Sequence, residues 1–180
     1  TREILDVQRR VLARVHAGRA TGVAVVGEAA YAEAISSARH LISEQRELVR
    51  SLCTSGHRVQ CAIGRAGAGK TTTMRAAADA WTSAGYRVVG AAVKGEAARH
   101  LAAGAGITTE TVAWYLARAD RTSLPLDDQT VLIVDEASTL SDRDLDALLA
   151  ITERAGAAVR LVGDPDQHGA VAAGGMFRHL

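Results

Sequence analysis

The sequence predicts an α/β fold in which helices flank a parallel sheet, and three observations support this prediction. Short apolar segments alternate with longer segments of helical composition, which is typical of βαβ units. Residues 131–134 are four consecutive apolar residues, as expected of a strand buried on both faces of a parallel sheet. Polar residues directly follow several of these segments, and open parallel sheets bind ligands beyond the carboxyl ends of their strands.

The composition is that of one ordinary domain with a small additional segment. Of the 180 residues, 48% are hydrophobic and 3% are aromatic, so the core should consist mainly of Ala, Val, Leu and Ile. The formal net charge of +1 gives no overall signal for nucleic acid or membrane, although it does not exclude a local basic groove. No apolar stretch approaches the roughly 18 residues of a membrane span, so we expect no membrane partner.

The two cysteines, Cys53 and Cys61, do not have the spacing of a zinc site. Cys61 lies within an apolar segment, so a buried and reduced thiol is expected there. No signal peptide opens the chain. These features predict a protein of the reducing cytoplasm.

Residues 1–40 are predicted to form a helical appendage to the main domain, which spans residues 41–180. Apolar residues recur at helical spacing over residues 1–17, and an Ala-rich helix is expected over residues 28–40. Neither segment carries a catalytic motif. Ser43 is a suitable N-cap for the next helix, which should extend to about Cys53.

Residues 59–73, VQCAIGRAGAGKTTT, contain the most specific motif in the chain. They match the P-loop pattern G-x-x-x-x-G-K-[ST], with Gly64, Gly69, Lys70 and Thr71 in the fixed positions. The glycines allow backbone N–H groups to turn toward an anion, and Lys70 adds a positive charge for the β- and γ-phosphates. A chance glycine-rich turn would also match, but the apolar strand before it and the Ala-rich helix after it favour a phosphate site. The predicted ATP contacts in this segment are Gly64, Gly67, Ala68, Gly69, Lys70, Thr71 and Thr72.

The remaining elements follow from apolar periodicity and from turn residues. Strands are expected at residues 59–63, 87–93, 131–134 and 159–162. Helices are expected at residues 70–84, 96–103, 111–119 and 142–155. Gly104 to Gly106 should end the second of these helices, and Ser141 should cap the last.

Carboxylates follow the strand at residues 131–134, where Asp135 and Glu136 cannot both belong to the core. Near a P-loop, Asp135 is expected to help Thr71 hold Mg²⁺, through a bridging water. Glu136 can act as the general base that activates the attacking water. The alternative is a carboxylate pair that only caps the following helix.

The last predicted strand is followed by Gly163-Asp164-Pro165-Asp166-Gln167. After the P-loop and the pair Asp135-Glu136, this is the third set of polar residues expected at the carboxyl edge of the sheet. Asp164 is a predicted nucleotide contact. The Gln167 amide could reach the γ-phosphate or the attacking water, although an uninvolved loop glutamine remains the alternative. No arginine in the sequence has the position of an arginine finger, which rapid ATP hydrolysis requires. We therefore expect the arginine finger to come from outside this segment.

In this order, the motifs resemble the first RecA-like domain of superfamily 1 DNA helicases. The resemblance is to the RecD/TraA-like 5′-to-3′ branch and to the helicase region of conjugative, MobF-type relaxases, over about residues 41–180. GRAGAGKTT resembles motif I, VDEAS resembles motif II, and LVGDPDQ resembles motif III, whose glutamine couples the γ-phosphate to the DNA site. LISEQ resembles the Q motif, which implies that Gln45 reads the adenine edge.

The resemblance also implies partners. Residues 92–98 match motif Ia, which contacts single-stranded DNA, but Val93-Lys94 stands where the family usually has Pro-Thr. Lys94 could replace the lost hydroxyl contact with a charge. His168 stands where a leucine normally follows the motif III glutamine. Motifs IV to VI are absent, which implies a second RecA-like domain in the same longer chain, and we expect this segment alone to bind ATP with slow or no hydrolysis.

Three hypotheses remain open from the sequence. The first is an ATP-dependent motor domain of a DNA helicase, either in a conjugative relaxase or in a RecD-like exonuclease subunit. The second is a RecA-like module that binds single-stranded DNA without turnover. The third is an unrelated P-loop ATPase or kinase, although no substrate-binding insertion is evident.

Overall fold

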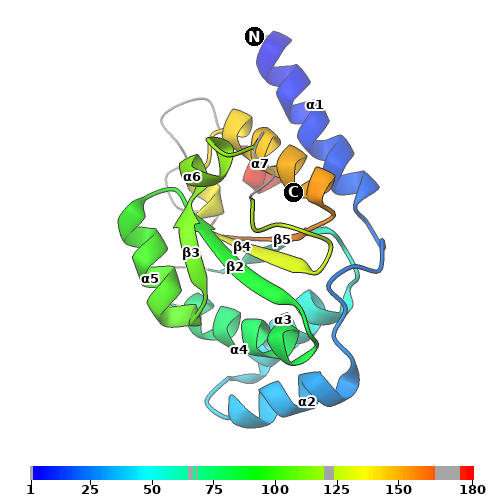
Figure 1. The fold of residues 1–180 in the computed structure, drawn as a ribbon, viewed down its shortest axis with the longest axis vertical. Helices are drawn as coiled ribbons and strands as arrows, with labels where there is room; N and C mark the ends of the chain where they lie inside the picture. The colour runs from blue at the N-terminus through cyan, green and yellow to red at the C-terminus, as the bar shows by residue number, and fades with distance from the viewer. Residues whose placement is uncertain (1, 65–66, 68, 120–123, 165–174) are drawn as a thin grey trace.

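The computed structural model describes residues 2–64, 67, 69–119, 124–164 and 175–180. Five parallel strands form one sheet in the order β1-β5-β4-β2-β3 (Figure 1). The strands are β1 (Val59–Ile63), β2 (Arg87–Ala92), β3 (Thr108–Thr111), β4 (Thr130–Asp135) and β5 (Ala158–Gly163). The predicted parallel sheet with flanking helices is therefore confirmed.

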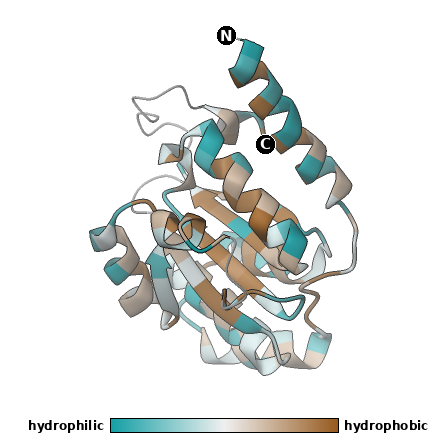
Figure 2. Cartoon of the chain, turned by 45° about the horizontal axis from the view of Figure 1, so that its top comes forward, coloured by the Kyte–Doolittle hydropathy of each residue, from teal (hydrophilic) through white to brown (hydrophobic). Residues whose placement is uncertain are grey.

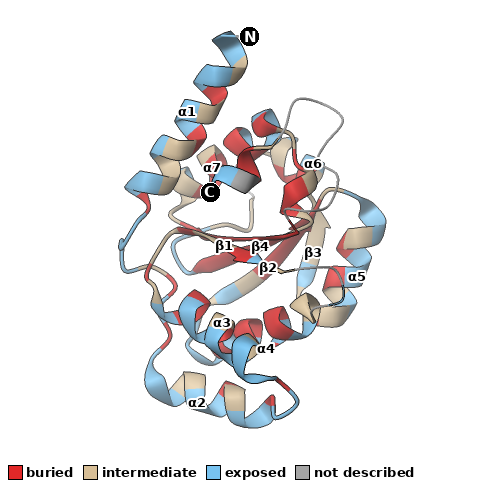
Figure 3. Ribbon diagram, turned by 180° about the vertical axis from the view of Figure 1, so that it is seen from behind, coloured by how far each residue is buried: buried red, intermediate tan, exposed pale blue. Residues whose placement is uncertain are grey.

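Seven α-helices and two short 3₁₀ turns surround the sheet within the described residues. The helices are α1 (Arg2–Ala17), α2 (Glu28–Ser37), α3 (Ser43–Thr54), α4 (Lys70–Ser83), α5 (Gly95–Ala105), α6 (Val112–Leu116) and α7 (Asp142–Ala155), and the turns are η1 (Ala137–Thr139) and η2 (Met176–His179). Helices α3 and α4 cover one face of the sheet and α6 and α7 cover the other, so the molecule has three layers (Figures 1 and 3).

The packing of the central strand β4 explains why residues 131–134 are all apolar. Val131 and Ile133 pack into the core beside α3 and α4, whereas Leu132 and Val134 pack into the core beside α7. All four side chains are fully buried. Alternate residues of a strand face opposite sides, so a strand covered on both faces needs apolar residues at every position, as the hydropathy of the sheet shows (Figure 2).

One strand and several helix ends differ from those predicted. The strand β3 was not predicted, because its residues Thr108–Thr111 are mostly polar and partly exposed at the sheet edge. Thr111 is therefore not the first helical residue but the N-cap of α6, where its Oγ1 accepts a hydrogen bond from the Trp114 N–H. Gly104 lies within α5, which ends one residue before the left-handed Gly106.

Another difference lies at α3, where Ile42 and not Ser43 occupies the N-cap position. The Ile42 N–H donates to Oε1 of Gln45, three residues later. A side chain that returns to the N-cap backbone in this way satisfies one of the polar groups at the helix end.

The first 40 residues contact both faces of the main domain. Helix α1 packs on α7, where the Gln8 amide donates to Asp142 over 2.8 Å and Arg10 pairs with Asp146 over 2.8 Å. The carbonyl of Ala24 accepts a hydrogen bond from the buried indole N–H of Trp81 over 2.9 Å. The predicted domain boundary at residue 40 stays a prediction. Among the described segments, the helices are too short or too polar to cross a bilayer.

The two thiols should react slowly with maleimide or disulfide reagents while the protein is folded. Burial raises the pKa of Cys53 to about 12 and that of Cys61 to about 11. Because only the thiolate reacts, labelling at pH 8 should be slow until denaturant exposes both groups. The free energy of unfolding should also fall as the pH rises above 9.0, the ordinary pKa of a thiol, because the unfolded chain then loses thiol protons that the folded protein retains. Labelling of Cys53 in native buffer as fast as in denaturant would contradict this.

Candidate functional site

The carboxyl edge of the sheet brings the predicted polar sets to one side of the molecule. Ile63, the last residue of β1, pairs with Gly163, the last residue of β5, and the Gly64 N–H donates to the Gly163 carbonyl over 3.2 Å. Asp135 is the last residue of β4 on the other side of β5. Strand β5 therefore separates the P-loop from the carboxylate pair, and two strand spacings amount to about 10 Å. This leaves room for phosphates and a hydrated cation between them.

The P-loop borders a cavity of about 420 Å³, a volume within the range that holds small ligands. Nζ of Lys70, the first residue of α4, donates to the Gly64 carbonyl over 2.7 Å, so it lies beside the start of the loop. Gly69 adopts a left-handed conformation with φ of 71° immediately before α4. The cavity is lined by Glu44, Gln45, Leu48, Ala62, Ile63, Gly64, Lys70, Thr73, Met74 and Val162.

Gln45 reaches this cavity from α3. Its Oε1 accepts from the Ile42 N–H, and its Nε2 lies so close to Gly69 that any side chain at position 69 would collide with it. Glycine at position 69 thus allows both the left-handed backbone conformation and the close approach of the Gln45 side-chain amide. The structure brings Gln45, Gly64 and Lys70 together around one cavity, although they come from separate parts of the chain.

The carboxylate pair has a constrained backbone. Glu136 has a φ of 53°, in the left-handed region that residues other than glycine seldom adopt. Oδ1 of Asp135 accepts the Glu136 N–H over 2.9 Å, and the Glu136 carbonyl accepts the N–H and the hydroxyl of Thr139, each over 2.8 Å. These bonds hold the turn while both carboxyl groups stay partly exposed. Strained backbone of this kind is frequent at functional sites.

A second cavity of about 330 Å³ connects this pair with the start of α5. It is lined by Lys94, Glu96, Ala97, His100, Asp135 and Glu136. Lys94, the N-cap of α5, thus shares a cavity with the predicted general base. His100 was not predicted from the sequence, because a single histidine on an exposed helix face carries no motif.

The other predicted contacts are distributed as follows. Thr72 lines a separate cavity of about 220 Å³, together with Arg75 and Asp79 of α4, and not the cavity at Lys70. Asp164 directly follows β5 and is buried, with 5% of its surface exposed. Ala68 and Gln167 lie outside the described residues. Leu48 and Ile63 line the P-loop cavity without having been predicted, since nothing in an apolar helix face or strand end marks a ligand contact.

The residues present suit a magnesium-bound nucleotide. Mg²⁺ prefers oxygen ligands and is usually held by one or two protein groups together with substrate phosphates and water. The Thr71 hydroxyl at the start of α4 and the Asp135 carboxylate, whose Oδ1 accepts the Glu136 N–H, supply this chemistry. A cluster of three or more metal-ligating side chains, as an all-protein cage would need, is absent from the described parts of the chain.

Comparison with known proteins identifies relatives. The family model described as an AAA domain matches residues 40–180. The probable conjugal transfer protein TraA of Sinorhizobium fredii is 40% identical over 148 residues, which cover 82% of this chain and 13% of that protein. The conjugal transfer protein TraA of Rhizobium radiobacter is 46% identical over 123 residues, 68% of this chain and 11% of that protein.

The ATP-dependent RecD2 DNA helicase of Deinococcus radiodurans is 38% identical over 138 residues, which cover 74% of this chain and 19% of that protein. The chain thus spans less than a fifth of the length of each of these relatives. They confirm the resemblance to the RecD/TraA-like helicases that the motifs predicted. Because the family model covers most of its length, the chain belongs to the AAA domain family.

Proposed function

We propose that this chain is the ATP-binding motor domain of a 5′-to-3′ DNA helicase that forms part of a conjugative relaxase. The observation that carries the proposal is the sheet order, in which β5 lies between the P-loop strand β1 and the carboxylate strand β4. The two halves of a phosphate and metal site then face each other across one strand, near enough to share a nucleotide. Similarity to TraA proteins and to RecD2 supports the choice of a helicase within conjugation.

Each residue has a separable task in this proposal. The P-loop N–H groups and Lys70 would bind the phosphates, and Gln45 would contact the adenine edge. Thr71 and Asp135 would hold Mg²⁺, which supplies charge neutralisation at the phosphates. Glu136 would accept a proton from the attacking water. Asp164 and Gln167 would extend the site from the end of β5.

The second cavity supports coupling to DNA. A cation at Lys94 could bind a phosphate of single-stranded DNA while lying in the same cavity as Glu136. A strand bound there would then change the surroundings of the general base. A second RecA-like domain in the longer protein would close the site and supply an arginine to the γ-phosphate. The cytoplasmic location expected from the sequence stays a prediction.

The test is DNA-stimulated ATP hydrolysis by a longer protein that contains this chain and the second motor domain. We expect hydrolysis to rise when single-stranded DNA is added, and Lys70→Ala to abolish both the basal and the stimulated rate. The 180-residue chain alone should bind ATP with little turnover. The proposal would be refuted if single-stranded DNA did not change the rate of ATP hydrolysis and Lys70→Ala kept the wild-type rate.

Measuring the affinity for single-stranded DNA with and without ATP separates the alternatives. A module without turnover would bind single-stranded DNA with an affinity that does not change when ATP is added. A motor domain should change its DNA affinity with the nucleotide state, since linkage between the two sites is reciprocal. Full activity without any nucleic acid would instead favour a P-loop ATPase or kinase of another kind.

A further inference from the structure

The end of helix α5 contacts the first turns of α4 through two glycines. A side chain at Gly104 would overlap the methyl group, Cγ2, of Thr71, and one at Gly106 would lie 3.3 Å from the guanidinium carbon of Arg75. Thr71 and Arg75 are four residues apart on α4, so they lie on one face of that helix. The two helices therefore meet where α5 has no side chains.

This contact fixes the side chain of Thr71. Threonine has stiff rotamers about its Cα–Cβ bond, and in helices it divides between two of them. The hydroxyl of Thr73, two residues later, is held by a 3.0 Å hydrogen bond to the Gly69 carbonyl, whereas among the described residues the Thr71 hydroxyl has no such bond. Because the Thr71 β-carbon is chiral, seating its methyl group against Gly104 also determines where its hydroxyl points.

We infer that Gly104 is a positioning residue for the magnesium ligand Thr71, acting through the methyl group. This rests on the metal role proposed above for Thr71. A rotation of about 120° about the Cα–Cβ bond would move the hydroxyl oxygen by roughly 2 Å. Mg²⁺ requires oxygen ligands at about 2.0–2.1 Å in near-ideal octahedral geometry, so such a displacement removes the ligand.

Gly104→Ala should therefore weaken the magnesium dependence of nucleotide binding. The new methyl group overlaps Cγ2 of Thr71, one bond from the stiff β-carbon, so either that side chain rotates or α5 moves away from α4. We expect the Mg²⁺ concentration for half-maximal stimulation of ATP binding to rise about 10–100-fold. Binding measured in EDTA should not change, because the P-loop contacts remain.

A second substitution distinguishes this mechanism from a general disturbance of α5. Serine keeps the hydroxyl but lacks the methyl group, and the motif accepts it at this position. Thr71→Ser alone should need more Mg²⁺ than the wild type, because its hydroxyl is no longer positioned through the methyl group. Adding Gly104→Ala to Thr71→Ser should then change the Mg²⁺ dependence by less than about threefold, because no methyl group remains to be displaced. Gly27→Ala, at the N-cap of α2 with open space around it and a φ of −69°, is the control. It should slightly lower the unfolding temperature, because alanine is a poorer N-cap than glycine, but leave the Mg²⁺ dependence unchanged.

The experiment uses a fluorescent ATP analogue, titrated with Mg²⁺ and in EDTA, with thermal unfolding of each variant to verify folding. A Gly104→Ala effect that disappears in the Thr71→Ser background supports the inference. An unchanged Mg²⁺ dependence in Gly104→Ala, or an equally large effect of Gly104→Ala in both backgrounds, overturns it. Thr71→Val tests the underlying function separately. If Thr71→Val binds Mg²⁺-nucleotide normally, the metal role of Thr71 is wrong and the inference falls with it, whereas a defect in Thr71→Val with a normal Gly104→Ala overturns only the inference.

Discussion

Glu136→Gln should lower ATP turnover by roughly 10²–10⁴-fold while leaving ATP affinity within a few-fold of the wild type. Glutamine has nearly the same size as glutamate but cannot accept the proton of the attacking water. The bonds that hold the turn come from the Asp135 carboxylate and from the Glu136 carbonyl, and neither depends on the Glu136 side chain. The variant should therefore keep its fold and lose only the chemical step.

Phosphate release by the longer, DNA-stimulated protein and equilibrium binding of a fluorescent ATP analogue measure the two quantities. Glu33→Gln is a suitable control, because it makes the same chemical change at an exposed position of α2. If Glu136→Gln retains turnover within tenfold of the control, the general base is another group. A parallel loss of affinity would instead indicate that Glu136 contributes to nucleotide or metal binding.

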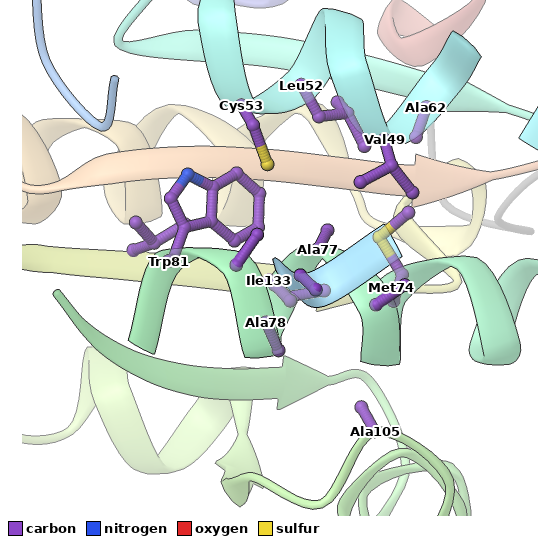
Figure 4. Packing of buried hydrophobic residues seen from close by; sticks show 14 of the residues in the cluster. Val49, Leu52, Cys53, Ala62, Met74, Ala77, Ala78, Trp81, Ala105 and Ile133 are labelled. Carbon is purple, nitrogen blue, oxygen red and sulfur yellow. The ribbon is translucent and has the colours of Figure 1, made fainter. Parts of the chain in front are cut away.

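Arg160→Met should destabilise the fold by about 2–4 kcal/mol, although Arg160 lies outside the site. Arg160 lies in the middle of β5 and is completely buried. Its guanidinium donates to the carbonyls of Leu52, over 3.1 and 3.3 Å, and of His57, over 3.0 Å. It also lies 5.3 Å from the ring centre of Trp81, whose indole lies beside Cys53 in Figure 4.

The destabilisation follows from these acceptors. Leu52 belongs to the last turn of α3, where helix carbonyls lack partners within the helix and favour a cation. Burial lowers the pKa of Arg160 to about 10, so the group remains charged at neutral pH. Among the described residues no carboxylate pairs with Arg160, so methionine removes the cost of burying the charge and leaves no opposite charge behind. It also leaves the buried carbonyl of Leu52 and the partly buried carbonyl of His57 without these donors. An unsatisfied buried group costs about 1–3 kcal/mol, and this loss should exceed the gain from removing the buried charge.

Denaturant unfolding followed by tryptophan fluorescence measures the change. Arg9→Met is the matched control, because Arg9 is exposed and its pairing with Asp6 joins two solvated side chains, so its effect should stay within about 0.5 kcal/mol. Arg160→Lys should not restore stability, since one ammonium cannot supply the separate N–H groups that reach Leu52 and His57. Equal midpoints for Arg160→Met and Arg9→Met would show that these bonds contribute nothing net.

The apolar strands and the P-loop could be predicted because their signals are local. Residues 131–134 are all apolar, and a strand covered on both faces requires this. The phosphate motif depends on adjacent residues with fixed spacing, so Gly64, Lys70 and Thr71 are recognisable without the fold. By contrast β3 has polar residues at a sheet edge, and its alternation is too weak to distinguish a strand from the start of the helix predicted at Thr111.

The sequence by itself determined the α/β class, the P-loop and the carboxylates that end β4. Only the tertiary structure decided that β5 lies between these two halves of the site, that Gln45 packs against Gly69, and that Gly104 seats the Thr71 methyl group. It also decided that Arg160, a charged residue within a predicted apolar strand, is buried against α3. The physical reason is that periodicity and motif spacing reflect interactions between near neighbours in the chain. Strand order, buried charge and close backbone approach depend instead on partners that are distant in sequence.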